Sequence, residues 1–297
     1  MKILHKKAFS LIEISVVILI IGMLIAGISQ GIDLYQDMRL ATARSLTLNS
    51  RVNRIEDLTM WFEAASEKSF ENPNPQDGDR IALWKNINFK LSNRIDVAKI
   101  QADLDSSRPF YVRNAINNIP ALRFDNAQFL TASNVKISEI VSSDQATVFM
   151  VQNNFSGDDK TTTFGWNSGS NRFQSHAQES DRVLIDYGDT NVNGGSRVST
   201  PVLTNFLNQN KIITFVKNGS NVVIKINAAI LANSSSSSAT INTSLSANFS
   251  IGKYPPDDNY YFKGYVGEFI VFKKALTDEE ISSIETYLSK KWAIKIN

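Results

Sequence analysis

The sequence predicts a long N-terminal α-helix followed by an all-β sandwich of the jelly-roll type that ends in a C-terminal helix. Three observations lead to this fold class. A continuous apolar run fills residues 11–28. Many short apolar or alternating stretches, separated by turn residues, follow between residues 58 and 272, which is typical of a sandwich or jelly roll. An amphipathic segment with a helix-start pattern lies near the end of the chain.

Residues 11–28 contain one charged residue, Glu13. As a helix this run is about 27 Å long, close to the thickness of bilayer hydrocarbon, so it predicts a membrane span. The basic residues Lys2, Lys6 and Lys7 place the N-terminus in the cytoplasm and the rest of the chain outside. A carboxylate in such a segment costs about 2.5–3.5 kcal/mol at the helix centre and indicates a functional partner. An ordinary secretory signal and a plain membrane anchor remain alternative interpretations.

Beyond the apolar run, apolar residues continue at spacings of three and four as far as Ile55, and no Pro or Gly interrupts between Ile32 and Ile55. The pattern predicts one helix over residues 9–54, about 70 Å long, half membrane span and half amphipathic stalk. A break near Gly31, with a separate second helix, is the alternative.

From residue 58 the pattern changes to strands. Asn218-Gly219 between two apolar stretches predicts a tight hairpin. Two segments of low complexity, 189–199 and 233–239, are expected to be exposed loops. The apolar stretch 146–151 is expected to be a central strand. The predicted strands cover residues 58–64, 80–84, 119–125, 146–151, 164–166, 182–187, 211–216, 221–226 and 262–272.

At the C-terminal end, Thr277 and Glu280 have the spacing of a capping box, which predicts a helix from Asp278 to about Trp292. The expected buried stripe of this helix consists of Ile281, Ile284, Tyr287 or Leu288, and Trp292.

The amino-acid composition limits which partners and which kinds of site the chain can have. The chain has 297 residues, enough for one large domain or two small ones, and a formal charge of +2, so we expect no nucleic-acid partner. Cysteine is absent, which excludes disulfides, thiolate metal sites and cysteine nucleophiles. Of the two histidines, His5 lies near the N-terminus, and His176 is expected in a loop without a partner.

The first residues resemble the N-terminal signature of type IV prepilins and of the pseudopilins of type II secretion. The resemblance rests on Lys6-Lys7, Ala8, Phe9 and the run from Ser10 to Glu13 before the apolar helix. It implies that a prepilin peptidase cleaves between Ala8 and Phe9 and methylates the new N-terminus at Phe9. It also implies that Glu13 pairs with the N-terminal amine of a neighbouring pilin or pseudopilin subunit. The chain departs from the family in having Ala8 where Gly is usual, and in lacking a proline before Pro73.

The last strand and helix, with residues 58–62, 83–84 and 120–124, resemble concanavalin A-like domains of the laminin-G type over roughly residues 58–296. The two resemblances together imply a leader at 1–8, a transmembrane and assembly helix at 9–55, and a β-sandwich head at 56–297. They imply a prepilin-like subunit of a pilus or pseudopilus in the bacterial inner membrane. Its head would lie in the periplasm, or outside the cell on a filament, and would bind a glycan or protein. The alternative is a membrane-anchored carbohydrate-binding, or less readily hydrolysing, protein that does not polymerise.

We expect no enzymatic activity and no catalytic residues. A retaining glucanase needs two carboxylates about 5–5.5 Å apart. The nearest pattern, Glu179-Ser180-Asp181, lacks a third acid at Leu184, and Asp186 and Asp189 are expected around a turn.

No cofactor is predicted, although calcium could find oxygen ligands in three loops that are otherwise ordinary turns. A sugar-stacking face could form from four aromatic residues, but such residues in sandwiches are more often core. The loops are Asp77-Gly78-Asp79, Asp158-Asp159 and Asp257-Asp258-Asn259, and the aromatic residues are Trp166, Tyr254, Tyr260 and Tyr261.

Overall fold

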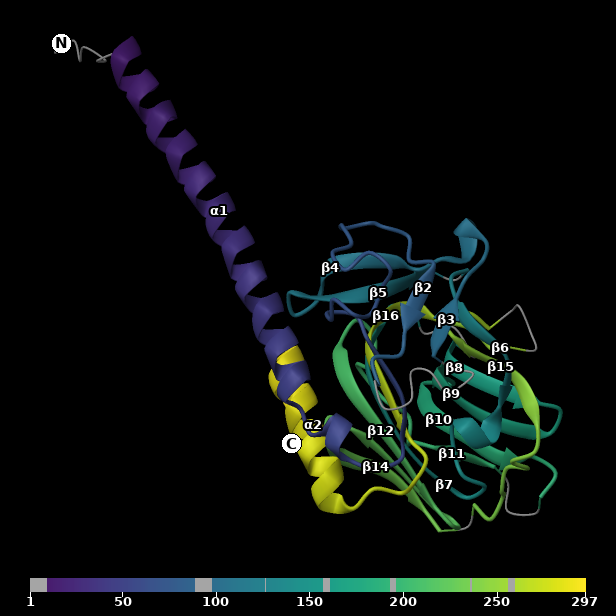
Figure 1. Cartoon of the computed structure of the whole chain (residues 1–297). Helices are drawn as coiled ribbons and strands as arrows, with labels where there is room; N and C mark the ends of the chain where they lie inside the picture. Colours follow the sequence, from purple (N-terminus) through teal and green to yellow (C-terminus); the bar gives the residue numbers. More distant parts are fainter. Residues whose placement is uncertain are drawn as a thin grey trace, which may run out of the picture.

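The computed structural model describes residues 10–88, 98–125, 127–156, 161–192, 196–235, 237–255 and 260–297. Two antiparallel sheets pack face to face, and a layer of helices covers the outer face of one of them (Figure 1). The predicted fold class is confirmed: a long apolar helix, a two-sheet sandwich and a C-terminal helix.

Helix α1 (Leu11–Asn49) has 39 residues and is therefore about 58 Å long. It passes through Gly31 without interruption, so the alternative of a break at that point is wrong. The helix ends earlier than the predicted residue 54 because Ser50 has an extended backbone, with φ −66° and ψ 157°. A short 3₁₀ turn, η1 (Val52–Arg54), follows it.

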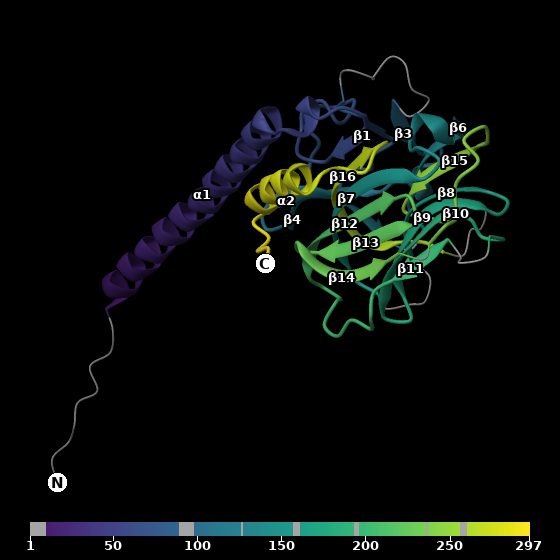
Figure 2. The ribbon, with the colours of Figure 1, turned by 90° about the horizontal axis from the view of Figure 1, so that it is seen from below.

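The N-terminal half of α1 extends away from the sandwich (Figures 1 and 2), and every side chain of residues 11–28 is exposed. Among the described residues, α1 is the one helix long and apolar enough to cross a membrane. Such a helix near an N-terminus is typical of a signal sequence or a membrane anchor. The other half of α1 packs on the head, where Ala43 and Thr47 are buried.

Sheet A has eight strands, with β7 and β16 near its centre, as predicted for residues 146–151. Strand β16 pairs with β7 along one edge and with β5 and β1 along the other. The predicted hairpin at Gly219 is confirmed, because β12 pairs with β13 in register from Ile213–Ile226 to Asn218–Asn221. The order is β14 (Ala229–Ser234), β13 (Asn221–Ile226), β12 (Asn210–Asn218), β7 (Gln145–Asn154), β16 (Lys263–Phe272), β5 (Ile119–Asp125) and β4 (Phe110–Ile116), with β1 (Leu58–Glu63) on β16.

Sheet B also has eight strands. The order is β11 (Arg197–Ser199), β10 (Arg182–Asp189), β9 (Asn171–Glu179), β8 (Thr161–Ser168), β15 (Ser246–Ile251), β6 (Leu130–Lys136), β3 (Lys99–Gln101) and β2 (Leu83–Lys85). Two 3₁₀ turns, η2 (Asp105–Ser107) and η3 (Ile137–Glu139), lie in the connections.

Three predictions about local structure are wrong in detail. The strand expected at 80–84 begins at Leu83, and Arg80 forms only an isolated bridge with Phe110. The segment 189–199 is not wholly a loop, because β11 occupies its end. The serine-rich segment is not wholly exposed either. Ser237 and Ala239 are buried, and Ser237 accepts a hydrogen bond from Lys217 Nζ.

Aromatic rings fill the core between the sheets. The ring of Phe164 on β8 lies 5.0 Å from those of Phe173 on β9 and Phe269 on β16, which joins the two sheets. Trp166 belongs to this core, is fully buried, and donates its Nε1–H to the carbonyl of Val135. It therefore cannot contribute to a sugar-stacking face.

A second core lies between sheet A and helix α2 (Asp278–Trp292). Its capping box is confirmed: Thr277 Oγ1 accepts from Glu280 N at 3.2 Å, and Glu280 Oε2 accepts from Thr277 N at 2.9 Å. The predicted buried stripe is confirmed too. Gly267 allows Trp292 to approach β16, because a Cβ at this position would lie 2.5 Å from the indole ring.

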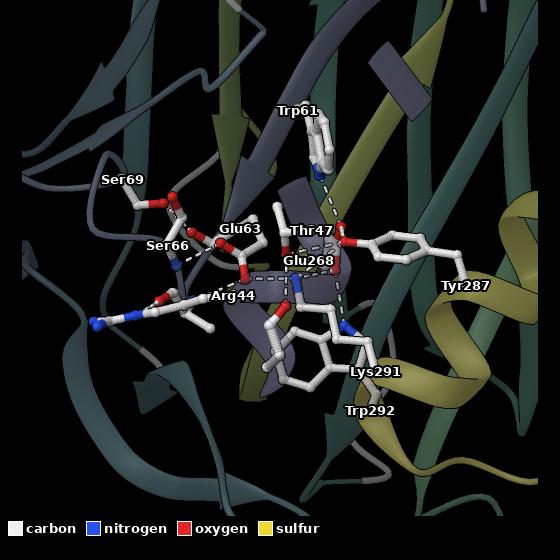
Figure 3. A network of polar contacts seen from close by, with 12 residues as sticks. Arg44, Thr47, Trp61, Glu63, Ser66, Ser69, Glu268, Tyr287, Lys291 and Trp292 are labelled. Carbon is white, nitrogen blue, oxygen red and sulfur yellow. Dashed lines mark hydrogen bonds and ion pairs between the residues drawn. The ribbon is translucent and has the colours of Figure 1, made fainter. Parts of the chain in front are cut away.

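A network of buried charges crosses this second core (Figure 3). Lys291 donates to Glu63 and, at 2.8 Å, to Glu268, and all three side chains are fully buried. Glu268 also accepts hydrogen bonds from Trp61 Nε1 at 2.7 Å, Tyr287 Oη at 2.8 Å and Trp292 Nε1 at 2.8 Å. Burial raises the pKa of Glu63, and the charge of Lys291 opposes this. The network links β1, β16 and α2 through side-chain contacts.

Candidate functional site

A polar pocket of about 410 Å³ lies on the outer face of sheet B, away from the helices. Along β9, Phe173 and Ala177 point into the core, so Arg172, Gln174 and His176 point outward. The pocket is lined by Arg172, Gln174, His176, Glu179, Arg197, Tyr254 and Tyr260.

Asp186 on β10 organises the floor of this pocket. It is the direct cross-strand partner of Gln174 on β9 and of Arg197 on β11. Arg197 binds it in a bidentate manner, with Nε 2.7 Å from Oδ1 and Nη2 2.8 Å from Oδ2, and its Nη1 lies 2.9 Å from Glu179 Oε1. Burial alone would raise the pKa of Asp186, but the hydrogen bonds and charge of Arg197 outweigh burial and lower this pKa.

Gln174 and His176 continue the floor. Gln174 Nε2 donates to Asp186 Oδ2 at 2.8 Å and lies 3.1 Å from His176 Nε2, which therefore acts as an acceptor. The proton of the neutral ring is then on Nδ1, 3.0 Å from Thr162 Oγ1. Burial lowers the pKa of His176, although Asp186 opposes this, so the ring is neutral at pH 7.

The sequence-based prediction that His176 lies in a loop without a partner is thus wrong. Residues 171–179 form a strand, and its outward residues Arg172, Gln174 and His176 are polar. Its inward apolar positions are too few to give a clear alternating signal.

Tyr254 and Tyr260 form the aromatic wall. Their ring centroids lie 5.9 Å apart at an interplanar angle of 61°, and Asn167 Nδ2 holds Tyr254 Oη at 2.9 Å. The segment that carries Tyr254 approaches the sheet closely at Gly165, where a Cβ would lie 2.7 Å from Pro255 Cδ. Tyr261 instead packs on Phe129, with ring centroids 6.2 Å apart. Two of the four candidate aromatic residues therefore line the pocket.

The two acidic residues of the pocket, Glu179 and Asp186, share the guanidinium of Arg197. Asp186 is poorly suited to acid catalysis, because its pKa is lowered whereas a general acid needs a raised pKa. Asp186 lies inside β10 and Asp189 ends this strand, so the expectation that both flank a turn is wrong for Asp186. The arrangement is suited to binding a polar ligand through hydrogen bonds and ring contacts.

The other sequence candidates lie elsewhere. Ala8 and Phe9 are outside the described residues, as are Asp158-Asp159 and Asp257-Asp258-Asn259. Glu13 lies in the first turn of α1, where its Oε2 accepts from the backbone N–H of Ser10 at 2.8 Å.

The carboxylates of Asp77 and Asp79 accept backbone N–H groups of Arg113 and Gln76, as turn residues do. Within the described ranges, no group of three His, Cys, Asp or Glu residues could hold a metal ion.

The family model of the Concanavalin A-like lectin/glucanases superfamily, of the laminin G type, matches residues 120–282, more than half of the chain. No curated protein sequence matches.

Solved structures share the fold at low sequence identity. Domain 4 of AbnA, a GH43 extracellular arabinanase from Geobacillus stearothermophilus, solved with arabinotriose, is 17% identical with a TM-score of 0.52. The match covers 77% of this chain and 98% of that domain. The Ruminococcus gnavus IT-sialidase CBM40, bound to α2,3 sialyllactose, is 12% identical with a TM-score of 0.41, and the match covers 48% of this chain and 83% of that chain. The SAP-like pentraxin from Limulus polyphemus is 14% identical with a TM-score of 0.42, over 55% and 80%.

Proposed function

The chain belongs to the Concanavalin A-like lectin/glucanases superfamily, and on this premise we propose that its head is a lectin-like module that binds carbohydrate. The proposed binding site is the pocket on the outer face of sheet B. In this proposal α1 anchors the protein in a membrane, with the N-terminus in the cytoplasm and the head outside.

The observation that carries the proposal is the composition of the pocket. Tyrosine rings form one wall, and planar guanidinium and amide groups form the floor. Sugars present apolar C–H faces and many hydroxyl groups, which such a surface can contact together. The volume of about 410 Å³ is in the usual range for a small-ligand site. The arabinanase domain of similar fold was solved with a short sugar, which further supports a saccharide ligand.

We propose binding without hydrolysis. Both acids near the pocket are ion-paired to Arg197, and the lowered pKa of Asp186 keeps this carboxyl from protonating a leaving group at neutral pH.

Full-length protein in detergent micelles, applied to an immobilised panel of oligosaccharides, tests this function. We expect at least one class of glycan to bind and Tyr254→Ala to weaken this binding about tenfold or more. Tyr35→Ala is the matched control, because Tyr35 is exposed on α1, outside the pocket. Equal binding by all three proteins, or no binding to any glycan, would contradict the proposal.

A second function is favoured by Glu13, the single charge within the exposed apolar run of α1. It is that of a prepilin-like subunit of a type IV pilus or type II secretion pseudopilus in the inner membrane. A prepilin peptidase would cut between Ala8 and Phe9 and methylate Phe9. Glu13 would then pair with the amine of a neighbouring subunit, and α1 would be the assembly helix.

Two measurements test this second function. The intact mass of the mature protein, from cells with and without the peptidase, reports both the cut before Phe9 and the methyl group. Glu13→Ala should abolish incorporation into filaments released by shear.

Ser10→Ala is the matched control, because it removes the hydroxyl of the same capping box and keeps the carboxylate. Equal loss in both variants would indicate that Glu13 acts only as a helix cap. An uncut N-terminus in cells that contain the peptidase would rule out the subunit function.

A further inference from the structure

Within the described part of the chain, the floor of the pocket has one hydrogen-bond acceptor and one donor that are buried and have no partner in the protein. The acceptor is Gln174 Oε1, on a side chain that is 1% exposed. The donor is Arg172 Nε. A buried polar atom without a partner is costly, so such atoms mark places where a ligand can supply the missing group.

The orientation of the Gln174 amide is fixed by its neighbours. Its Nε2 faces two acceptors, Asp186 Oδ2 at 2.8 Å and His176 Nε2 at 3.1 Å. An amide rotated by 180° would direct Oε1 at the Asp186 carboxylate, which can only accept, so the contact with Asp186 fixes the orientation and, with it, the acceptor role of His176 Nε2. The unused atom is therefore the carbonyl oxygen, which can pair only with a group that donates a hydrogen bond.

Among the residues that the structure describes, the formal charges of the pocket balance. Arg197 is occupied by the carboxylates of Asp186 and Glu179, and Arg172 Nη1 lies 4.0 Å from Asp186 Oδ2. Two cations thus face two anions, and Gln174 holds Nε2 of His176 as an acceptor. An anionic ligand would gain little from this arrangement, and its carboxylate could not donate to Gln174 Oε1.

We infer that the ligand of this pocket is an uncharged sugar with adjacent hydroxyl groups, rather than a sialic acid, uronic acid or sulfated glycan. One hydroxyl donates to Gln174 Oε1, and the same or the neighbouring hydroxyl accepts from Arg172 Nε. Arg172 and Gln174 are alternate residues on the same face of β9, and Tyr254 lies beside them. This inference rests on the proposed carbohydrate-binding function and narrows it to one ligand class.

Matched pairs of probes test the ligand class with the unmodified full-length protein in detergent. Each pair consists of a neutral saccharide and the same saccharide carrying an acidic sugar. The pairs are lactose with 3′-sialyllactose, and xylotriose with its glucuronic acid-substituted form. The panel also includes uncharged arabino-oligosaccharides. We expect an uncharged probe to bind at least tenfold tighter than the acidic probes, with little dependence on salt. O-methylation of the hydroxyl that meets Gln174 should weaken binding about tenfold, because an ether cannot donate.

A variant tests the acceptor from the side of the protein. Gln174→Met should weaken the uncharged probe about tenfold. Gln152→Met is the control, since Gln152 is equally buried but bonds to Asn154 and Thr163 instead. The O-methylated probe is measured with the unmodified protein, so this test remains valid even if Gln174→Met misfolds.

The possible results distinguish failure of the inference about ligand class from failure of the proposed carbohydrate-binding function. If an acidic probe binds tighter than its uncharged partner, and Arg172→Gln removes this preference, the inference is overturned while carbohydrate binding stands. Unchanged affinity for the O-methylated probes would also overturn it. If no saccharide of either kind binds, the proposed function is overturned and this inference with it.

Discussion

Thr47 of α1 and Tyr287 of α2 are joined by a hydrogen bond of 3.3 Å between their hydroxyl oxygens, inside the core that covers sheet A (Figure 3). Tyr287 in turn donates to Glu268, which Lys291 neutralises. The helix that could cross a membrane is therefore tied to the charged centre of the head, although most of its length makes no contact with it.

Lys291→Met is expected to destabilise the protein by about 3–5 kcal/mol, because it leaves Glu63 and Glu268 buried without a cation. Urea unfolding of the full-length protein in detergent, followed by tryptophan fluorescence, measures the change. Lys290→Met is the control, since Lys290 is exposed on the same helix and should change the free energy of unfolding by less than about 0.5 kcal/mol. A loss below about 1 kcal/mol for Lys291→Met would show that the carboxylates do not depend on this lysine.

A double-mutant cycle with Thr47→Val and Tyr287→Phe measures the coupling between stalk and head. Each hydroxyl contributes about 1 kcal/mol, and the pair should show an interaction energy above about 0.5 kcal/mol because the two are in contact. Stability from chemical unfolding provides the four values. Additive effects would mean that this hydroxyl contact does not couple α1 to the head.

The free energy of unfolding should fall as the pH is lowered from about 7.5 toward 5.5. Burial lowers the pKa of His176 below its usual 6.5, so the unfolded chain takes up a proton that the native ring resists. The stabilisation is therefore complete above pH 6.5 and is lost as the pH falls toward the lowered pKa. Urea midpoints at several pH values measure this.

His176→Gln provides the comparison, because other groups also titrate. Burial raises the pKa of Glu63, so the pH dependence of its contribution to stability has the opposite sign. That contribution is lost as the pH rises above 4.5. The pKa of Asp186 is lowered, so its contribution to stability is lost only as the pH falls below the usual pKa of 3.8. Both remain in the variant, so the difference between the two proteins isolates His176. Parallel pH profiles would contradict the neutral, buried ring.

Gly165→Ala should reduce glycan affinity about tenfold while preserving the fold. The added methyl group would lie 2.7 Å from Pro255 Cδ and must push away the segment that holds Tyr254. Isothermal titration with the best ligand, together with the unfolding midpoint, gives both values. Gly169→Ala is the control for glycine replacement, since its Cβ would meet nothing within 4 Å, although its positive φ of 63° costs some stability. Unchanged affinity for Gly165→Ala would show that Tyr254 does not form the wall of the site.

The framework of the fold could be predicted because its signals are local. Thr277 and Glu280 determine where α2 begins, Gly219 identifies a hairpin, and the apolar run 146–151 identifies a central strand. The spacing of Ser10 and Glu13 is the same capping-box signal, and it gives Glu13 a role within its own helix. The resemblance to prepilins assigns this residue only a role between subunits.

The pocket could not be predicted in the same way because register creates it. Gln174, Asp186 and Arg197 become neighbours only when β9, β10 and β11 pair as they do. A shift by one residue would send all three into the core. The acidic residues of this region suggest possible catalysts in the sequence. The residue that pairs with them is Arg197, which lies in a segment whose composition predicts a loop.

The pocket and the stalk helix lie on opposite outer faces of the sandwich. Molecules crowded together through their helices could therefore keep every pocket open toward the surroundings. An array of this kind gains avidity from its number of heads, so a single site of millimolar strength would be enough for firm attachment to a repetitive glycan surface.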